Sequence, residues 1–203
     1  MERQDSVAGT PGGFPGLERM SLRIVAGEFG GRRIEVLSGR QVRPTGERVR
    51  EAWFSALGDR ISGSTAIDLF AGSGALGIEA LSRGASMVHF IEEDRRCFEV
   101  LRGNIASLEL SARARLHRGE VFNFLSRLGA EPRFDLALAD PPYGQEVAAK
   151  LVKEFHRRPF AGLLCVERRV DDADGSSPIW ERRYGDTMLS FYSAPKGGDT
   201  GDW

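Results

Sequence analysis

From Thr65 onward, short apolar segments of the strand type alternate with segments of helical periodicity. Strands are predicted at 65–70, 86–92, 114–119, 134–140 and 162–168, and helices at 75–83, 94–108, 120–128 and 145–158. Strands that are separated by helices form a parallel sheet with helices on both faces. Near the end, two strand segments, 179–183 and 187–192, are separated by only three residues, which predicts an antiparallel hairpin. The sequence therefore predicts an α/β fold.

The 203 residues suit one domain with a small appendage. Residues 1–20 are rich in Gly, Pro and polar side chains and are predicted to be a disordered extension, with Met20 as a candidate start of the core. Residues 21–60 are predicted to form a β-hairpin and a helix with Thr45 as its N-cap. Residues 61–195 then form the main domain, and 196–203 a flexible tail.

Composition and charge exclude several classes of protein. The net charge of −1 gives no whole-molecule attraction to nucleic acid. No apolar run approaches the ~18 residues of a membrane span, and the three histidines are scattered, so no metal site is expected. We therefore expect a cytoplasmic protein without membrane or metal partners, and a monomer.

Residues 72–77, GSGALG, form a G-x-G-x-x-G motif between a predicted strand and helix, and Glu92 ends the next strand. Dehydrogenases use this pattern to bind the pyrophosphate and ribose of a dinucleotide. Asp68, four residues before Gly72, changes this interpretation. A carboxylate repels a pyrophosphate but attracts an ammonium group, such as that of S-adenosylmethionine. The motif thus favours S-adenosylmethionine, and a nicotinamide-dependent oxidoreductase remains the alternative from another class.

The sequence DPPY, residues 140–143, follows the fourth predicted strand of the parallel sheet. Asp140 offers a side-chain acceptor, while Pro141 and Pro142 remove two backbone donors and stiffen the turn. Tyr143 adds a flat ring on which a base can stack. Acceptors beside a stacking ring are what an exocyclic base amine requires, so DPPY predicts methylation of such an amine on a flipped base.

These motifs resemble those of class I S-adenosylmethionine-dependent methyltransferases that act on exocyclic amines. Together with the segments RIVAGEFGGRRIEV, RPTGERVREAWFSAL and FDLALADPPYG, they resemble the RsmD family over about Leu22 to Tyr192. That resemblance implies a Rossmann-like, seven-stranded, mostly parallel sheet with an antiparallel last strand. It also implies methylation of the N2 amine of a specific guanine in 16S rRNA of the small ribosomal subunit, with the assembled subunit as the expected partner.

The resemblance also assigns roles to individual residues. The expected cofactor-binding residues are Asp68, Phe70, Gly72, Gly74, Glu92, Glu120, Val121 and Asp140. The expected catalytic residues are Asp140, Pro141, Pro142 and Tyr143. Glu120 stands where many relatives have aspartate or asparagine near the adenine.

The N-terminal hairpin and helix are the predicted RNA-docking surface, because basic side chains gather there. The candidates are Arg23, Arg32, Arg33, Arg43, Thr45, Arg48 and Arg50. Two further alternatives stay open at this point: methylation of adenine N6 in DNA or RNA, and a non-catalytic RNA-binding subunit with the same fold.

Overall fold

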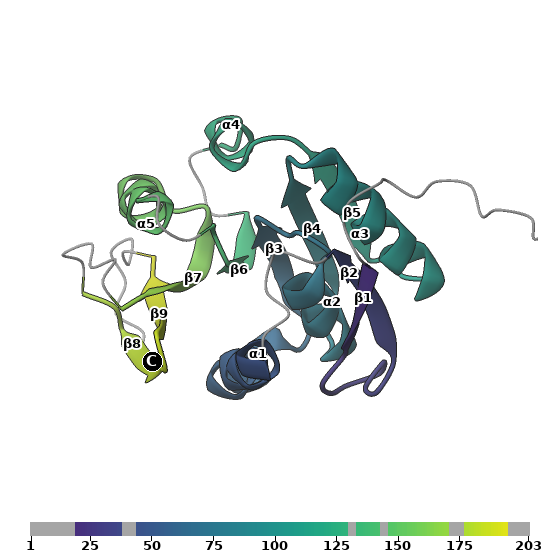
Figure 1. The fold of residues 1–203 in the computed structure, drawn as a ribbon. Coiled ribbons are helices and arrows are strands. Elements are labelled where there is room, and N and C mark those ends of the chain that lie inside the picture. The colour runs from purple at the N-terminus through teal and green to yellow at the C-terminus, as the bar shows by residue number, and fades with distance from the viewer. Residues whose placement is uncertain (1–18, 38–43, 130–132, 143–145, 171–176, 195–203) are drawn as a thin grey trace, which may run out of the picture.

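The computed structural model describes residues 19–37, 44–129, 133–142, 146–170 and 177–194. Its main feature is a seven-stranded sheet of order β5-β4-β3-β6-β7-β9-β8, beside a separate two-stranded sheet, β1–β2 (Figure 1). The strands of the large sheet are β3 (Thr65–Leu69), β4 (Met87–Glu92), β5 (Ala114–Arg118), β6 (Phe134–Ala139), β7 (Ala161–Arg169), β8 (Trp180–Tyr184) and β9 (Thr187–Ser193). The helices are α1 (Pro44–Leu57), α2 (Ala75–Ser82), α3 (Arg95–Ser107), α4 (Val121–Ser126) and α5 (Val147–Arg157), with a short 3-10 helix, η1 (Gly58–Ile61).

Strands β3 to β7 are parallel to one another, whereas β9 runs antiparallel to both β7 and β8. The predicted Rossmann-like fold with an antiparallel last strand is confirmed. Strand β9 lies between β7 and β8, so the last strand is inside the sheet and β8 forms its edge. This insertion brings the turn between β8 and β9 next to the parallel strands.

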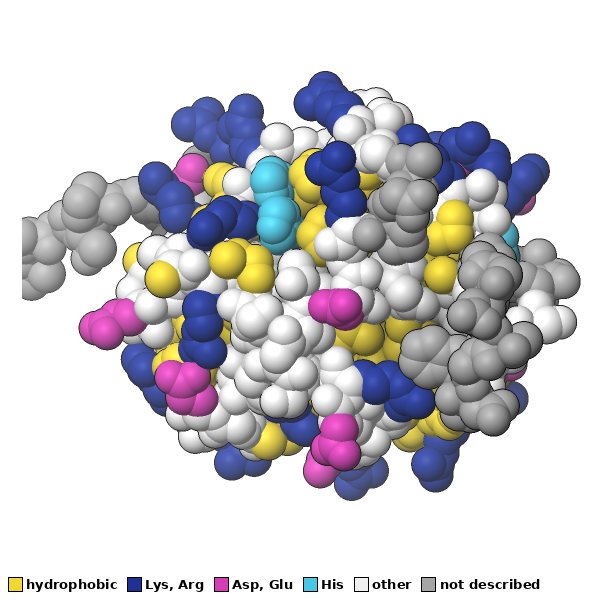
Figure 2. Space-filling view, turned by 180° about the vertical axis from the view of Figure 1, so that it is seen from behind, with side chains coloured by type: hydrophobic (Ala, Val, Ile, Leu, Met, Phe, Trp, Pro, Cys, Tyr) yellow, Lys and Arg dark blue, Asp and Glu magenta, His cyan; other side chains and the backbone are white. Residues whose placement is uncertain are grey.

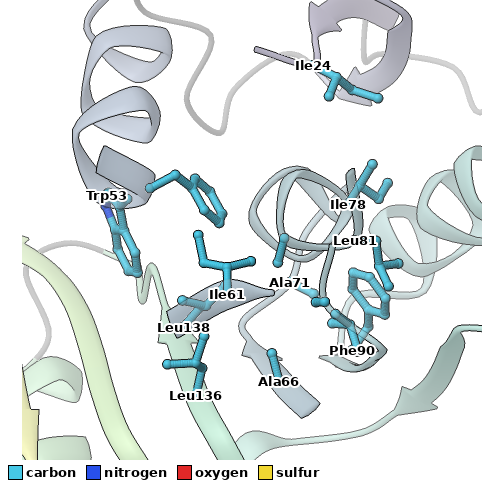
Figure 3. Packing of buried hydrophobic residues seen from close by; sticks show 14 of the residues in the cluster. Ile24, Trp53, Ile61, Ala66, Ala71, Ile78, Leu81, Phe90, Leu136 and Leu138 are labelled. Atoms are coloured by element: carbon cyan, nitrogen blue, oxygen red, sulfur yellow. The ribbon is translucent and has the colours of Figure 1, made fainter. Parts of the chain in front are cut away.

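Each face of the sheet is covered by its own helices. Helices α1, α2 and α3 pack on one face and α4 and α5 on the other (Figure 1). On the first face, Leu136 and Leu138 of β6 lie below Ile61 and Trp53, as Figure 3 shows. Gly77 of α2 allows close helix–strand packing, because a Cβ there would lie 2.2 Å from the Phe90 ring.

The N-terminal hairpin begins earlier than predicted. Strand β1 (Arg19–Arg23) pairs antiparallel with β2 (Arg33–Leu37), so Arg19 and Met20 belong to a strand rather than to the predicted extension. Strand residues Ile34 and Val36 are buried, while Arg33 and Glu35 face outward.

The prediction of Thr45 as a helix N-cap is wrong. Helix α1 begins at Pro44, so Thr45 lies inside its first turn. Proline is favourable at the first helical position, because its missing N–H has no partner there in any case and its φ is already helical.

The hairpin is fixed to α2 by buried polar groups. Glu79, which is 1% exposed, accepts hydrogen bonds from the backbone N–H groups of Val25 at 2.8 Å and Ala26 at 3.0 Å. Gly27 has φ +83°, and a Cβ there would lie 1.9 Å from the carbonyl oxygen of Ser82. Only glycine can pass this close to the helix, so the hairpin is held in one position against the main sheet.

Candidate active site

The carboxyl ends of the central strands open into one cavity of about 830 Å³. Its lining comes from N-terminal, central and C-terminal parts of the described chain. The hairpin contributes Leu22 and Val36, and α1 contributes Val49, Arg50 and Trp53. The middle of the chain adds the glycine loop and the turn after β6, and the C-terminal hairpin adds residues 184–187. The topology therefore brings the predicted cofactor motif, DPP turn and N-terminal hairpin to a single hollow.

The glycine loop leaves β3 through a tight left-handed path. Phe70 has φ 62°, which is costly for a residue with a side chain, and Gly72 and Gly74 have φ 57° and 88°. A Cβ on Gly74 would lie 2.5 Å from the Leu101 side chain. Phe70 and Gly72 line the cavity, so the loop backbone forms part of its wall. Within the loop, the Ser73 carbonyl accepts a hydrogen bond of 2.9 Å from Nδ2 of Asn104 in α3.

Asp68 lies in β3 beneath this loop and is 1% exposed, yet it lines the cavity. Its Oδ2 accepts the N–H of Gly77 at 2.8 Å. The pKa of Asp68 is raised from 3.8 to about 7, chiefly by burial; the Gly77 hydrogen bond lowers it, and the nearby Glu92 carboxylate adds to the rise. A cation bound beside this buried carboxylate would stabilise its charged form.

Glu92 holds the loop in place. Its Oε2 accepts the N–H of Gly72 and its Oε1 that of Asp94, both at 2.7 Å, and the residue is 2% exposed. Glu92 is not among the described residues that line the cavity. Each carboxylate oxygen keeps a second lone pair that can accept from a ligand hydroxyl, so the ribose contact stays a prediction.

Glu120 is the N-cap of α4. Its two carboxylate oxygens accept the N–H groups of Phe122 at 2.9 Å and Asn123 at 2.6 Å, and Val121 next to it is buried. The sequence reasoning missed this capping role. The predicted adenine contact of Glu120 and the predicted cofactor contact of Val121 stay predictions, because neither residue is among the described lining residues of the cavity.

Asp140, Pro141 and Pro142 come directly after β6 and line the cavity together with Asp68. Residues Leu69 and Ala139 are paired in the sheet, which places Asp140 beside the start of the glycine loop. The structure thus brings the predicted cofactor loop and three of the four predicted catalytic residues together. Tyr143 lies outside the described residues.

Several lining residues were not expected from the sequence. They are Trp53 of α1, Glu167 at the end of β7, and the turn residues Tyr184, Gly185, Asp186 and Thr187. Glu167 carried a usable signal, because it directly follows the apolar run 163–166, just as Asp140 follows the apolar run 136–139. The turn residues carried none, because their position depends on the insertion of β9 between β7 and β8.

The predicted RNA-binding residues fall into three groups. Arg23, Arg32, Arg33 and Arg48 are exposed. Arg43 and the side chain of Thr45 lie outside what the structure describes. Arg50 differs from its prediction, because it is 6% exposed and its Nη2 donates to the carbonyl of Arg23 at 2.9 Å. Burial lowers the pKa of the Arg50 guanidinium, although Glu79 and Glu47 raise it. Arg50 therefore belongs to the cavity wall and not to an open docking surface.

The face opposite that of Figure 1 carries Lys and Arg side chains around its margins with acidic side chains among them (Figure 2). His89 and His117, distant in sequence, stack on neighbouring strands with ring centroids 5.2 Å apart. Among the residues that the structure describes, no three His, Cys, Asp or Glu side chains form a group able to hold a metal ion. In that same part of the chain no helix is long and apolar enough to cross a membrane.

Comparison with known proteins gives a family and close structural relatives. The family described as "Conserved hypothetical protein 95" matches residues 22–193. The "Ribosomal RNA small subunit methyltransferase D" of Haemophilus influenzae is 39% identical over 155 residues, which are 74% of this chain and 80% of that protein. The solved structure of Escherichia coli yhhF is 30% identical with a TM-score of 0.75, and covers 86% of this chain and 98% of its own.

A more distant solved structure shares the fold alone. It is the 16S rRNA N2 methyltransferase RsmC of T. thermophilus, in complex with AdoMet and guanosine. It is 21% identical with a TM-score of 0.67, and the match covers 89% of this chain and 52% of that protein.

Proposed function

The chain belongs to the family described as "Conserved hypothetical protein 95", the RsmD family, and from this premise we propose an S-adenosylmethionine-dependent methyltransferase acting on the N2 amine of a guanine in 16S rRNA. One observation carries the proposal: Asp68 and the Asp140–Pro142 turn line the same cavity. A carboxylate that could bind the ammonium of the cofactor and a set of acceptors that could bind a base amine therefore face the same cavity. We further propose that the enzyme is a cytoplasmic monomer and that its substrate is the assembled small subunit.

The residues around the glycine loop fit S-adenosylmethionine. The carboxylate of Asp68 would pair with the ammonium of its amino-acid part, and the backbone of Phe70 and Gly72 would lie against that part. A pyrophosphate would meet the same buried carboxylate and be repelled, which disfavours the nicotinamide dinucleotides. Glu92 and Glu120 would hold the ribose and the adenine. When bound, this cofactor supplies a methyl group already activated by a sulfonium.

The turn after β6 positions the amine that accepts the methyl group. Asp140 and the carbonyl of Pro141 accept hydrogen bonds from the two N–H groups of the amine. This arrangement directs the nitrogen lone pair at the methyl group. Alignment of this kind supplies about 7–11 kcal/mol of the barrier. The acceptors also stabilise the positive charge that grows on nitrogen. The proton leaves after methyl transfer, when the nitrogen has become strongly acidic.

The target base must leave its stack to reach the cavity, so we propose that the enzyme flips it out of the RNA. The choice of guanine N2 in rRNA is supported by the relatives. The Haemophilus influenzae relative is named for the small-subunit rRNA, and RsmC, which shares the fold, is a 16S rRNA N2 enzyme. Nothing in the DPPY motif alone separates guanine from adenine.

The outer face of the N-terminal hairpin is the proposed RNA-docking surface. Arg23 and Arg33 are paired across β1 and β2, and both are exposed. Like charges directly opposite on a sheet destabilise it; Arg23 has the Glu47 carboxylate at 3.3 Å, and Arg33 donates to the hydroxyl of Ser21 at 2.7 Å. A phosphate over the pair would relieve this repulsion. On the opposite face of the same hairpin, Leu22 and Val36 line the cavity, so RNA docked here would lie beside the site.

Changing Arg23 and Arg33 together to glutamine is expected to weaken binding of small-subunit rRNA and to make that binding less dependent on salt. Two lost phosphate contacts should lower the slope of log affinity against log salt by about 1.5. The measurement is a filter-binding or fluorescence titration at several salt concentrations. The matched control removes the same charge from the exposed side of α5, as Lys153→Gln with Arg157→Gln. Equal slopes for the two double variants would contradict the docking surface.

A further inference from the structure

Glu167 lies beside Asp140 at the edge of the cavity. Ala139 and Val166 are paired between β6 and β7, so the next residues along, Asp140 and Glu167, are cross-strand neighbours about 4.8 Å apart in backbone spacing. Both residues line the cavity. Glu167 is half-buried, which is an unusual position for a carboxylate on a strand of the main sheet.

Sheet alternation assigns the Glu167 side chain to the α1 face. Cys165 belongs to the apolar cluster that contains Trp53 of α1, whereas Val166 belongs to the cluster on the α5 face. Arg168, the next residue, bonds to Ser190, whose side chain lies on that second face. Glu167 is therefore on the same face as Asp140, toward the space that the target base must enter.

We propose that Glu167 accepts the N1–H of the flipped guanine and so selects guanine over adenine; this rests on the proposed function. Guanine presents adjacent N–H donors at N1 and N2. With N2 held by Asp140 and Pro141, N1 points to the neighbouring strand, where Glu167 stands. Adenine has a bare acceptor nitrogen at N1, which would face the carboxylate without a proton between them. Two acceptors that face each other in this way repel, which disfavours adenine.

A second group in the cavity favours the same base. Trp53 is 0% exposed and lines the cavity, and its indole N–H is buried without a hydrogen-bond partner in the described part of the chain. Figure 3 shows the nitrogen edge of this ring turned away from Leu136 and Leu138. Buried indole N–H groups normally find an acceptor. The O6 oxygen of guanine supplies one, whereas an adenine whose N6 amine occupied the N2 site would place a C2–H there, which is no acceptor.

The experiment replaces the base rather than only the side chain. The enzyme is given assembled small subunits whose 16S rRNA carries either guanine or 2-aminopurine at the position that the wild-type enzyme methylates. 2-Aminopurine keeps the reactive 2-amine but lacks O6 and has an acceptor nitrogen at N1. Wild-type enzyme should prefer guanine by about 10³-fold or more in kcat/KM. In Glu167→Gln this preference should fall at least about tenfold, because the amide can donate to N1 of the analogue.

Each outcome has one meaning. A wild-type preference under tenfold overturns the inference, and this result needs no variant to fold. Slower methylation of both bases by Glu167→Gln with an unchanged preference also overturns it, since that pattern reports a structural role. Absence of any N2 methylation of guanine by the wild-type enzyme overturns the proposed function itself. Glu93→Gln, the same change at an exposed position, should retain the wild-type preference.

Discussion

Asp140→Ala is expected to lower kcat for methyl transfer by about 10²–10³-fold, the usual cost of removing one group that stabilises charge in a transition state. The affinity for S-adenosylmethionine should change no more than a few fold, because Asp68 and the glycine loop are the proposed main cofactor contacts. Asp140→Asn, which keeps one oxygen acceptor, should lose less. The measurements are single-turnover methyl transfer to small subunits and calorimetric titration with the cofactor.

The matched control is Asp135→Ala, at the other end of the same strand. Asp135 accepts the N–H of Thr65 at 2.7 Å and lies far from the cavity lining. This variant should lose some stability but keep kcat. A wild-type kcat in Asp140→Ala, or a loss explained wholly by weaker cofactor binding, would remove Asp140 from the proposed mechanism.

Asp68→Asn is expected to weaken S-adenosylmethionine binding by about 100-fold, because the buried carboxylate that we propose to pair with the ammonium is replaced by a neutral amide. The wild-type protein should also lose affinity below pH 7. The pKa of Asp68 is raised to about 7, so the carboxylate must give up a proton to bind the cation. Between pH 8 and pH 5.5 the affinity should fall roughly 30-fold. Calorimetry should find this pH dependence in the wild-type protein and not in Asp68→Asn.

The same pKa shift also makes the stability of the cofactor-free protein depend on pH. This stability falls as pH rises, whereas the cofactor affinity increases. The folded pKa of about 7 lies above the unfolded value of 3.8, so the folded state binds the proton more tightly. Without cofactor, the contribution of Asp68 to the free energy of unfolding is therefore largest below about pH 4 and is lost as pH rises through 7. Asp68→Asn, which can still accept the Gly77 N–H, should be more stable than the wild type at pH 8 by up to a few kcal/mol. A variant less stable at pH 8, with cofactor affinity retained, would contradict this role of Asp68.

Much of the fold followed from the sequence, because it depends on local patterns. Apolar runs between helical segments predicted the parallel strands, and the GSGALG motif marked the turn after β3. Helix boundaries were less certain, as Pro44 shows. Thr45 was predicted as the N-cap, although the helix begins at Pro44, because proline is stabilising at the first helical position.

Features that depend on strand order or on long-range packing could not be predicted. The sequence places the last hairpin at the end of the chain but does not say that β9 enters between β7 and β8. The contribution of residues 184–187 to the cavity was missed for this reason. Arg50 looked like its exposed arginine neighbours, yet α1 turns it toward the core and the Arg23 carbonyl. Glu120 was expected to contact the cofactor. Its role as an N-cap depends on where the backbone of α4 begins, which the sequence did not show.

The central claim is that one cavity brings the activated methyl group to the N2 amine of a guanine in 16S rRNA. It is tested most directly by incubating the protein with tritiated S-adenosylmethionine and small ribosomal subunits from cells that lack the enzyme. The rRNA is then digested to nucleosides, which are separated and identified by mass. The account predicts tritium in N2-methylguanosine from one position of 16S rRNA. Label in N6-methyladenosine, or no label in any rRNA nucleoside, would contradict it.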